Sequence, residues 1–523
     1  MRLPGAWRSG AETVWLPTGT EVAALDRDAV TRGATTERAL IECAGRELAH
    51  RVAAYWPEGP VTALVGSGHN GADALVALRT LHAWGRPVRA VQAGSEPPDP
   101  DVLVDRDLPL EPADAFLACP PGAGVILDGI LGTGIRGAPR PPQARLIEAI
   151  NGLGLPVIAV DGPSGANLDD GAVAGACVRA SLTVTLGWPK LGMLRSPARE
   201  RCGAIEAVEI GFPPFRKPPA ARAITGRSVA RQLVPRAADA HKGDAGFVVI
   251  VAGQEGMAGA SILAARAAIR GGAGVIRVVG DPANRLAVQA AEPGALFVSW
   301  SDDDARREAL HWAHVVAVGP GLGRGEARRE LVRRVLAERQ DRPAVVDADG
   351  LSVFAGAPDA LAEQLRPQDV LTPHPGELGR LLDVPAAGIA AEPFGRAREA
   401  ADRFGCTVVL KGAPTVVASP DGSLQVATVG GPALAAGGSG DVLTGALAAL
   451  LAAGLPGADA AAAALFLTGL AAESSDLPAG HAAADVPDRL PGARAAVEAL
   501  GPAPVGSVRF ALSDPDRPGG GLA

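Results

Sequence analysis

At 523 residues the chain is too long for one hydrophobic core, so we expect two or three domains. Hydrophobic residues make up 47% of the sequence and charged residues 20%, a balance that argues against a disordered protein. The net charge is −8 and the basic residues form no run, so we expect no nucleic-acid partner.

The cysteines and the apolar stretches indicate the compartment. The five cysteines are scattered and form no C-x-x-C pair, which is typical of a reducing compartment and of a protein without disulfides or zinc. The N-terminus shows no apolar core of signal-peptide length, and the long uncharged apolar stretch 442–458 is interrupted by glycine and proline. We therefore expect a cytoplasmic protein with no membrane partner.

Short apolar runs that end in glycine recur along the chain, each followed by a helical stretch. In the first half they are VTALVGSG, VRAVQAG, GVILDGILGTG, PVIAVDGPSG and LTVTLGWPK. In the second half they are FVVIVAG, GVIRVVG, VVAVGPGLG, PAVVDADG, DVLTPHPG and TVVLKGAP. Short runs rich in β-branched residues, alternating with helices, predict buried parallel strands. Both halves are thus predicted to be α/β, with ligands bound at the carboxyl ends of the strands.

A proline-rich segment, GFPPFRKPPAARAITGRS, separates the two halves. Its proline pairs interrupt both helix and sheet, so we place a domain boundary near residues 212–224. The first domain is expected at 1–220 and the second at 225–502. The Gly/Pro-rich tail, 503–523, is expected to be disordered.

In the first half, the glycine turn GSGHNG has the spacing G-x-G-x-x-G. A dinucleotide fingerprint also needs an acidic residue about twenty positions further on, and RPVRAVQAG supplies none, which weakens an ordinary dehydrogenase interpretation. Polar side chains at neighbouring strand ends could still meet in one crevice, where oxygen ligands suit a hard cation and glycine amides suit a diphosphate. Taken singly, each aspartate could equally be a turn or cap residue. The residues concerned are Asn70, Asp73, Asp128, Asp161 and Ser164.

The segments ECAGRELA, GSGHNGADALVALRTL, LDGILGTG and VDGPSG, in this order, resemble the NAD(P)H-hydrate epimerase family over about residues 15–215. The resemblance implies a Rossmann-like domain whose potassium ligands fall on Asn70, Asp128 and Ser164. It also places a substrate contact on Asp161, our candidate for acid–base work. The remaining substrate contacts that it implies are His69, Asn70, Gly71, Ala72, Asp73, Gly132, Thr133, Gly134, Ile135, Arg136, Gly137 and Ala138.

The turn departs from the family pattern at His69, where asparagine is usual, and at Ala72 and Ala74, where glycine is usual. A Cβ at Ala72 would crowd a phosphate that hugs the backbone, or would disfavour a positive φ. His69 could equally be a neutral substitution at a solvent-facing position. Because the cation and acid–base positions are retained, we expect an active epimerase; the alternative is a nucleotide-binding module that no longer turns over.

In the second half, AAGGSGD places a carboxylate where a glycine turn becomes the N-terminus of a long apolar helix. Successive amides at a helix N-terminus form an anion hole for a phosphate in transfer. Asp441, at its edge, can accept the proton of an attacking hydroxyl. A carboxylate that merely caps the helix is the plainer alternative. The anion hole is expected at Gly437, Gly438, Ser439 and Gly440.

This turn closes a series of motifs that starts at HKGDAGFVVIVAG and includes VGPGLGRG, VVDADGLSV, LTPHPGEL and VVLKGAPTVV. Together they resemble the ADP/ATP-dependent NAD(P)H-hydrate dehydratases, which have a ribokinase-like fold, over about residues 225–500. The resemblance implies contacts to the hydrated nicotinamide nucleotide at Ala260, Gly321, His374 and Asp441. It implies adenine-nucleotide contacts at Lys411, Gly412, Ala413, Pro414, Thr415 and Gly440.

The two resemblances together imply a repair enzyme with two activities. It would epimerise R- and S-NADHX or NADPHX and dehydrate the S epimer with ADP as phosphoryl donor, giving AMP and phosphate. Potassium is expected in the first domain and Mg²⁺ in the second, where Asp347, Asp349 and Glu377 either help to place the metal or cap loops. A homo-oligomer is expected. The alternative is a ribokinase-like vitamin or sugar kinase with a non-catalytic first domain.

Overall fold

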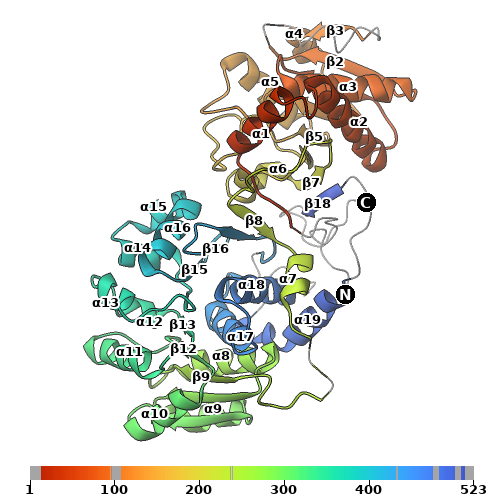
Figure 1. Ribbon diagram of the computed structural model, residues 1–523. Coiled ribbons are helices and arrows are strands. Elements are labelled where there is room, and N and C mark those ends of the chain that lie inside the picture. Colours follow the sequence, from red (N-terminus) through yellow and green to blue (C-terminus); the bar gives the residue numbers. More distant parts are fainter. Residues whose placement is uncertain are drawn as a thin grey trace. The chain divides into compact units, whose positions relative to one another are not determined.

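The structure, a computed structural model, describes residues 13–94, 96, 108–235, 237, 239–431, 434–474, 482–500 and 508–512. The chain forms two compact units that divide between residues 223 and 224, and the described residues 508–512 belong to the first unit (Figure 1). Within the described residues, no helix is both long enough and apolar enough to cross a bilayer.

The first unit is built on an eight-stranded sheet in the order β18-β7-β6-β5-β4-β1-β2-β3. All neighbouring strands are parallel except β18, which pairs antiparallel with β7. The strands are β1 (Val61–Val65), β2 (Val88–Gln92), β3 (Leu110–Pro112), β4 (Val125–Gly129), β5 (Val157–Val160), β6 (Leu182–Leu186), β7 (Ala204–Val208) and β18 (Val508–Leu512). The strand order reverses between β1 and β4, so a crevice is expected at their carboxyl ends.

Helices cover both faces of this sheet because its strands are apolar on both sides. Val61, Ala63 and Val65 of β1 belong to one core cluster with α2 and α3, whereas Leu64 belongs to another with α4 and α5. This alternation follows the two-residue period of a strand. The helices are α1 (Gly19–Thr31), α2 (Glu37–Tyr55), α3 (His69–Ala83), α4 (Ala113–Ala118), α5 (Pro141–Gly152), η3 (Leu191–Leu194) and α6 (Arg199–Cys202).

The second unit is built on a ten-stranded sheet in the order β11-β10-β9-β12-β13-β14-β15-β16-β17-β8. The strands from β11 to β15 are parallel, and β16 and β17 continue as an antiparallel hairpin. Here the order reverses between β9 and β12. The strands are β8 (Ala221–Ile224), β9 (Phe247–Val251), β10 (Val275–Gly280), β11 (Ala295–Ser299), β12 (Val315–Val318), β13 (Ala344–Val346), β14 (Val370–Leu371), β15 (Thr407–Leu410), β16 (Val416–Ala418) and β17 (Leu424–Ala427).

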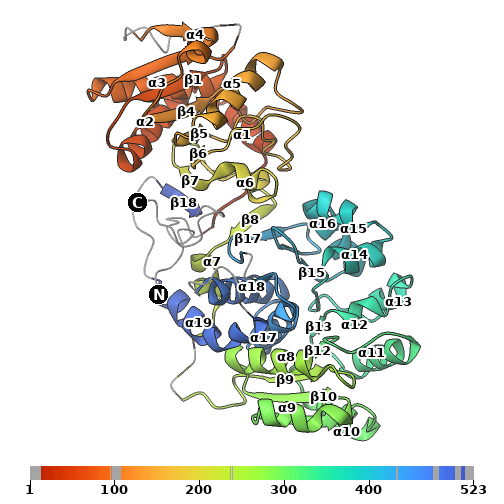
Figure 2. The same cartoon turned by 180° about the vertical axis from the view of Figure 1, so that it is seen from behind.

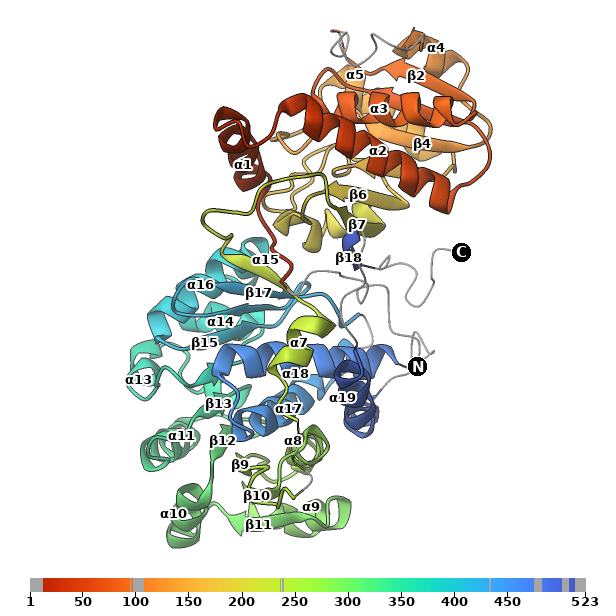
Figure 3. The ribbon, with the colours of Figure 1, turned by 45° about the vertical axis from the view of Figure 1, so that its right-hand side comes forward.

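One helix pair of the second unit packs unusually closely. A Cβ on Gly445 of α17 (Ser439–Ala452) would stand 2.0 Å from the backbone oxygen of Ala264 in α8 (Ala258–Gly271), so only glycine allows the two backbones to approach this far. Helix α17 also lies beside α18 (Figure 3) and packs on β9, β12 and β13. The close contact therefore fixes α17, whose first turn carries the GGSGD segment, against the middle of the sheet.

The remaining helices of the second unit complete its layers (Figure 2). They are α7 (Gly226–Gln232), α8 (Ala258–Gly271), η4 (Pro282–Asn284), α9 (Arg285–Ala291), α10 (Asp303–Trp312), α11 (Glu326–Glu338), α12 (Asp349–Ser352), α13 (Pro358–Ala362), α14 (Pro375–Leu382), α15 (Ala386–Ala391), α16 (Pro393–Phe404), α17 (Ser439–Ala452), α18 (Gly457–Glu473), η6 (Ala483–Asp485), η7 (Pro487–Arg489) and α19 (Leu490–Glu498).

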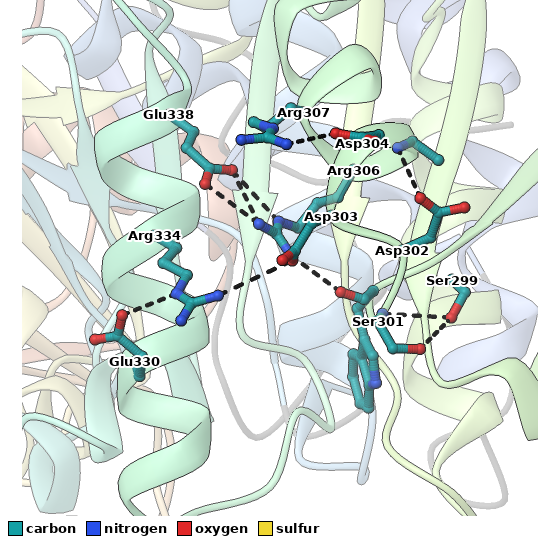
Figure 4. A network of polar contacts seen from close by, with 12 residues as sticks. Ser299, Ser301, Asp302, Asp303, Asp304, Arg306, Arg307, Glu330, Arg334 and Glu338 are labelled. Atoms are coloured by element: carbon teal, nitrogen blue, oxygen red, sulfur yellow. Dashed lines mark hydrogen bonds and ion pairs between the residues drawn. The ribbon is translucent and has the colours of Figure 1, made fainter.

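A polar network joins α10 to α11 at one end of this sheet (Figure 4). Arg306 is buried, and its guanidinium donates to Glu338 at 3.2 Å and to the carbonyl oxygen of Trp300 at 3.1 Å. It also pairs with Asp303 in its own helix. Because all of these contacts are made within the fold, we assign the network a structural role.

The predicted parallel strands are confirmed in both units. The prediction of a disordered tail is wrong for residues 508–512, because VRFAL pairs with β7 as the edge strand of the sheet and buries Phe510. The rest of 503–523 lies outside the described residues. The predicted boundary region, 212–224, contains the division between the units, which falls inside β8.

Candidate active sites

The first site lies where β1 and β4 end. Glycine is required at two positions of its turn, because another part of the backbone comes too close there for a Cβ. A Cβ on Gly71 would stand 1.9 Å from the carbonyl oxygen of Gly66, and a Cβ on Gly66 would stand 2.2 Å from that of Ile130. The turn after β1 therefore packs directly on the turn after β4, and α3 begins at His69 within this contact.

Three of the predicted polar residues meet here. The Asn70 side chain donates from Nδ2 to the carbonyl oxygens of Leu131, at 3.0 Å, and Val160, at 2.6 Å. Ser164 donates from its hydroxyl to Asp128 Oδ1 at 2.6 Å and from its backbone amide to Oδ2 at 2.8 Å. Asn70, Asp128 and Ser164 thus share one small space, as expected from their positions at adjacent strand ends.

This cluster fits a hard monovalent cation. Asp128 is fully buried, and no basic side chain among the described residues forms an ion pair with it. Burial raises the pKa of Asp128 to about 6, against the hydrogen bonds from Ser164 and Ile130 that lower it. Buried charges are normally paired or bound to metal, and the neighbouring groups offer only oxygen ligands. Asn70 keeps Oδ1 available because both of its hydrogen bonds use Nδ2.

Asp161 follows β5 and has the left-handed backbone φ of 60°, which is unusual for a residue other than glycine. Its Oδ1 accepts a hydrogen bond from the Leu186 amide at 2.8 Å and contacts the ammonium of Lys190. The sequence analysis missed Lys190. The signal available was a lysine within the loop WPK directly after a buried strand.

Asp73 is the fifth residue of α3 and is 4% exposed. Burial and the nearby carboxylates of Asp161 and Asp26 raise its pKa well above the ordinary range, while Lys190 lowers it. The first site therefore contains a carboxyl group of raised pKa near Asp161, whose own carboxylate contacts an ammonium. Such a pair of carboxyl groups in different environments suits acid–base chemistry.

Neither Ala72 nor His69 strains the backbone of the turn. Ala72 lies inside α3 without a positive φ, so its Cβ requires no unusual backbone conformation. The side chain of His69 is 63% exposed and bonds Glu37 at 2.7 Å. Arg136, in the predicted contact loop 132–138, donates hydrogen bonds to the Thr20 hydroxyl and the Asp169 carboxylate. Its guanidinium is therefore held by contacts within the chain.

The second site is centred on the first turn of α17. Gly438 has φ of 94°, and a Cβ there would stand 2.6 Å from the Leu263 side chain. The turn of Gly437, Gly438, Ser439 and Gly440 therefore adopts a conformation that only glycine accepts without strain at its second position. The amides that begin α17 lie at the positive end of a helix of 14 residues.

Asp441 is the third residue of α17, and among the described residues its carboxylate accepts no hydrogen bond. This observation argues against a mere capping role. Burial, followed by the nearby carboxylates of Asp347 and Asp349, raises the pKa of Asp441 to about 7, whereas Lys411 lowers it. A carboxyl group with such a pKa is suited to accept a proton near neutral pH.

Lys411 follows β15 and reaches back to the end of β13. Its Nζ donates to Asp347 Oδ1 at 2.7 Å, and Thr444 of α17 donates to Asp347 Oδ2 at 2.8 Å. The same ammonium lies 3.4 Å from the place where a Cβ of Gly440 would stand. Burial alone lowers the pKa of Lys411, but Asp347 and Glu377 raise it on balance. The lysine is therefore a fixed cation beside the glycine turn.

The other predicted contacts of the second site surround these groups. Gly321 and Ala260 are adjacent, since a Cβ on Gly321 would stand 2.9 Å from that of Ala260. His374 caps α14 through Nδ1, and burial with Lys411 and Arg380 lowers its pKa. Its side chain is 50% exposed, which excludes a buried core histidine. The loop of Lys411, Gly412, Ala413, Pro414 and Thr415 is closed by the Thr415 hydroxyl, which donates to Gly412 at 3.0 Å.

The three carboxylates considered for magnesium all have partners within the chain. Asp347 binds Lys411 and Thr444, Asp349 accepts from the Gly323 amide at 2.9 Å, and Glu377 accepts from the His374 amide at 2.8 Å. Within the described residues, no group of three histidine, cysteine, aspartate or glutamate side chains is arranged to hold a metal ion. All three carboxylates are therefore held by contacts within the chain.

Comparison with known proteins identifies relatives of both halves. A family model described as NAD(P)H-hydrate dehydratase matches residues 248–490, and one described as YjeF-related protein N-terminus matches residues 37–192. These matches agree with the two units of the structure and leave residues of both candidate sites inside the matched ranges.

Individual proteins match nearly the whole chain. The bifunctional NAD(P)H-hydrate repair enzyme Nnr of Salinibacter ruber is 36% identical over 94% of this chain and 98% of its own length. The protein of the same name from Coxiella burnetii is 33% identical, over 91% of this chain and 98% of its own length.

A solved structure matches about half of the chain. It is an ADP/ATP-dependent NAD(P)H-hydrate dehydratase from Bacillus subtilis, co-crystallised with ATP and Mg²⁺, which is 31% identical with a TM-score of 0.47. The match covers 52% of this chain and 98% of that structure's chain.

Proposed function

The chain belongs to the family of bifunctional NAD(P)H-hydrate repair enzymes, and from this membership we propose that it restores NADH and NADPH from their hydrates. The first unit interconverts the R and S epimers, and the second dehydrates the S epimer with ADP as phosphoryl donor. The observation that carries the dehydratase proposal is that the Asp441 carboxylate and the Lys411 ammonium both lie at the glycine turn that begins α17. The relatives do not favour the alternative of a vitamin or sugar kinase.

Dehydration requires that a poor leaving group be converted into a good one. Asp441 accepts the proton of the C6 hydroxyl while that oxygen attacks the terminal phosphorus of ADP, so that AMP leaves with the bridging oxygen. The electron pair of the ring nitrogen then expels the new phosphate from C6, and loss of the C5 proton restores the reduced nicotinamide. The products are AMP, inorganic phosphate and NAD(P)H.

The surrounding groups support this transfer electrostatically. The amides of Gly437, Gly438, Ser439 and Gly440 can donate to the phosphoryl oxygens at the positive end of α17. Lys411, held by Asp347, supplies a fixed positive charge next to them. We assign the loop from Lys411 to Thr415, with Gly440, to the adenine nucleotide, and Ala260, Gly321 and His374 to the hydrated nicotinamide nucleotide.

In the first unit we assign acid–base chemistry to Asp161. The turn of His69, Asn70, Gly71, Ala72 and Asp73 and the loop from Gly132 to Ala138 are assigned to the substrate. The close packing of the turn after β1 on the turn after β4 supports this assignment, because it holds the turn at the carboxyl ends of the strands, where α/β sheets bind ligands.

We assign a potassium ion to Asn70, Asp128 and Ser164. Among the described residues, the buried Asp128 carboxylate forms no ion pair, and the side-chain oxygens of Asn70 and Ser164 lie close to it. Bound there, the cation would neutralise Asp128 and fix the turns after β1, β4 and β5. Magnesium is assigned to the second unit, where it would neutralise phosphate oxygens alongside Lys411.

The test is recovery of absorbance at 340 nm from mixed-epimer NADHX with ADP or ATP, Mg²⁺ and K⁺. Complete rapid recovery with ADP is the expected result. Recovery that stops at the S fraction would refute the epimerase activity alone. A stable phosphorylated product without recovery would refute the dehydratase activity and favour a kinase. Asp161→Asn should spare dehydration of the S epimer and reduce consumption of the R epimer to its spontaneous rate.

A further inference from the structure

Lys190 is the most deeply buried amine of the first unit. Its side chain is 0% exposed, so neither solvent nor a substrate in the crevice reaches it. The ammonium contacts Asp161 Oδ1 and donates to Thr185 Oγ1 at 2.9 Å and to the Leu186 carbonyl oxygen at 3.1 Å. These three acceptors match the three N–H groups of an ammonium, so Lys190 is fully satisfied inside the fold.

The carboxylate of Asp161 is held from one side only. Oδ1 contacts Lys190, accepts from the Leu186 amide at 2.8 Å and lies 3.1 Å from the Thr185 hydroxyl. Among the described residues, Oδ2 has no hydrogen-bond partner, and the side chain is 10% exposed. One oxygen is therefore fixed to β6 and the loop after it, while the other remains open.

We propose that Lys190 is a positioning residue that anchors Oδ1 of Asp161 and thereby presents Oδ2 to the substrate. This proposal rests on the epimerase function proposed above. Lys190 itself touches no substrate. Its ammonium compensates the charge that Asp161 must carry as a base in a buried place, where an unpaired carboxylate is unfavourable.

The backbone of Asp161 supports the same conclusion. Its left-handed φ of 60° is held by a hydrogen bond from its amide to the Val184 carbonyl oxygen at 2.9 Å. The carboxylate and the amide of this residue are thus both bound to β6. Strained conformations persist where the surroundings over-determine them, and they cluster at functional sites. A purely structural ion pair would need neither this conformation nor an open second oxygen.

The experiment uses the full chain and measures conversion of R-NADHX to S-NADHX without ADP, by chromatography. Lys190→Met keeps an unbranched side chain, one atom shorter, and removes its charge. We expect kcat to fall about a hundredfold, within the range of a misplaced general base, with KM for R-NADHX changed less than twofold. In an Asp161→Asn background the same substitution should cause no further loss. An unchanged kcat, or losses that multiply in the double variant, would overturn the proposal.

Thr185→Val is the milder second variant, because it removes one contact of Lys190 and of Asp161 without a change in volume. If Lys190→Met does not fold, Thr185→Val should lower kcat about threefold at constant KM, as for one weakened hydrogen bond. An unaltered kcat in folded Thr185→Val would then overturn the proposal. A crystal structure of whichever variant folds gives a readout independent of activity. We expect the Asp161 carboxylate to lose its hydrogen bond to the Leu186 amide in the variant. A carboxylate in an unchanged position would overturn the proposal, whether or not the wild-type chain is active. Absence of epimerase activity in the wild-type chain would instead refute the proposed function.

Discussion

The ammonium of Lys411 donates a hydrogen bond of 2.7 Å to the buried carboxylate of Asp347. This contact joins the ends of β15 and β13, and the Thr444 hydroxyl ties the same carboxylate to α17. Three elements that are far apart in the sequence are thereby fixed around the glycine turn. The relationship makes the position of the Lys411 charge depend on a residue that lies outside the turn.

Replacing Asp347 with asparagine should loosen Lys411. A hydrogen bond to a charged group contributes about 1.5 to 3 kcal/mol, so we expect KM for ADP in the dehydratase assay to rise by roughly tenfold or more. Thr444→Val, which removes only one partner of Asp347, is the matched control and should change KM by about threefold. An unaltered KM for ADP in folded Asp347→Asn would show that Lys411 is positioned without Asp347.

Asp441→Asn should abolish dehydration while it leaves epimerisation intact. The asparagine preserves the shape of the side chain but cannot accept the hydroxyl proton, and loss of a general base costs about 10²- to 10⁴-fold in kcat. Recovery of NADH from S-NADHX measures the loss, and conversion of the R epimer is the internal control. Retained dehydration would contradict the assignment of Asp441 as the base.

The pH dependence of dehydration should report the raised pKa of Asp441. Only the ionised form accepts a proton, so kcat/KM should be constant above about pH 7 and should fall tenfold per pH unit below it. Because the Asp349 carboxylate contributes to raising this pKa, Asp349→Asn should move the midpoint to lower pH. A midpoint near that of an ordinary carboxylate in the unmodified chain would contradict this expectation.

Gly445→Ala should destabilise the second unit. The new Cβ would stand 2.0 Å from the Ala264 carbonyl oxygen, and overpacking of this kind typically costs about 1 to 3 kcal/mol or more. The two helices must separate, so dehydratase activity should fall together with Tm. Gly395→Ala in α16 is the control, since nothing lies within 4 Å of its Cβ and alanine favours helix by roughly 0.5 to 1 kcal/mol. Equal Tm values for the two variants would refute the packing argument.

Phe510→Ala should destabilise the first unit and not the second. Phe510 is fully buried in β18, and truncation of a buried phenylalanine costs about 3 to 5 kcal/mol. Epimerase activity should therefore be lost at a lower temperature, while the thermal inactivation of the dehydratase is unchanged. Arg509→Ala, whose side chain is 48% exposed, is the control on the same strand. A concerted loss of both activities would contradict the assignment of β18 to the first unit alone.

Much of the fold could be predicted because its central strands are continuous apolar runs that end in glycine. The strands that were missed are those without this pattern. Strands β16 and β17 form an antiparallel hairpin, and β7 and β18 lie at an edge, where a run such as VRFAL is indistinguishable from a loop until its partner is known.

The sites were predictable as sets of strand-end residues, and Asn70, Asp128 and Ser164 do meet. The contacts that Lys190 and Asp347 make could not be read from the sequence. These contacts join residues that are 29 and 64 positions apart, respectively, and spacing carries no information about such a pair. The concern over Ala72 depended on a backbone angle that only the structure provides.

The pairing of β18 with β7 makes the first unit discontinuous in the gene. While a ribosome translates the second unit, the first has β7 as an open edge, a surface prone to pair with other chains. Its sheet is completed only when residues 508–512 emerge, after the whole second unit has been synthesised. Truncating the chain between the two halves would therefore remove β18 from the sheet of the first unit. The two activities cannot be separated simply by dividing the sequence at that point.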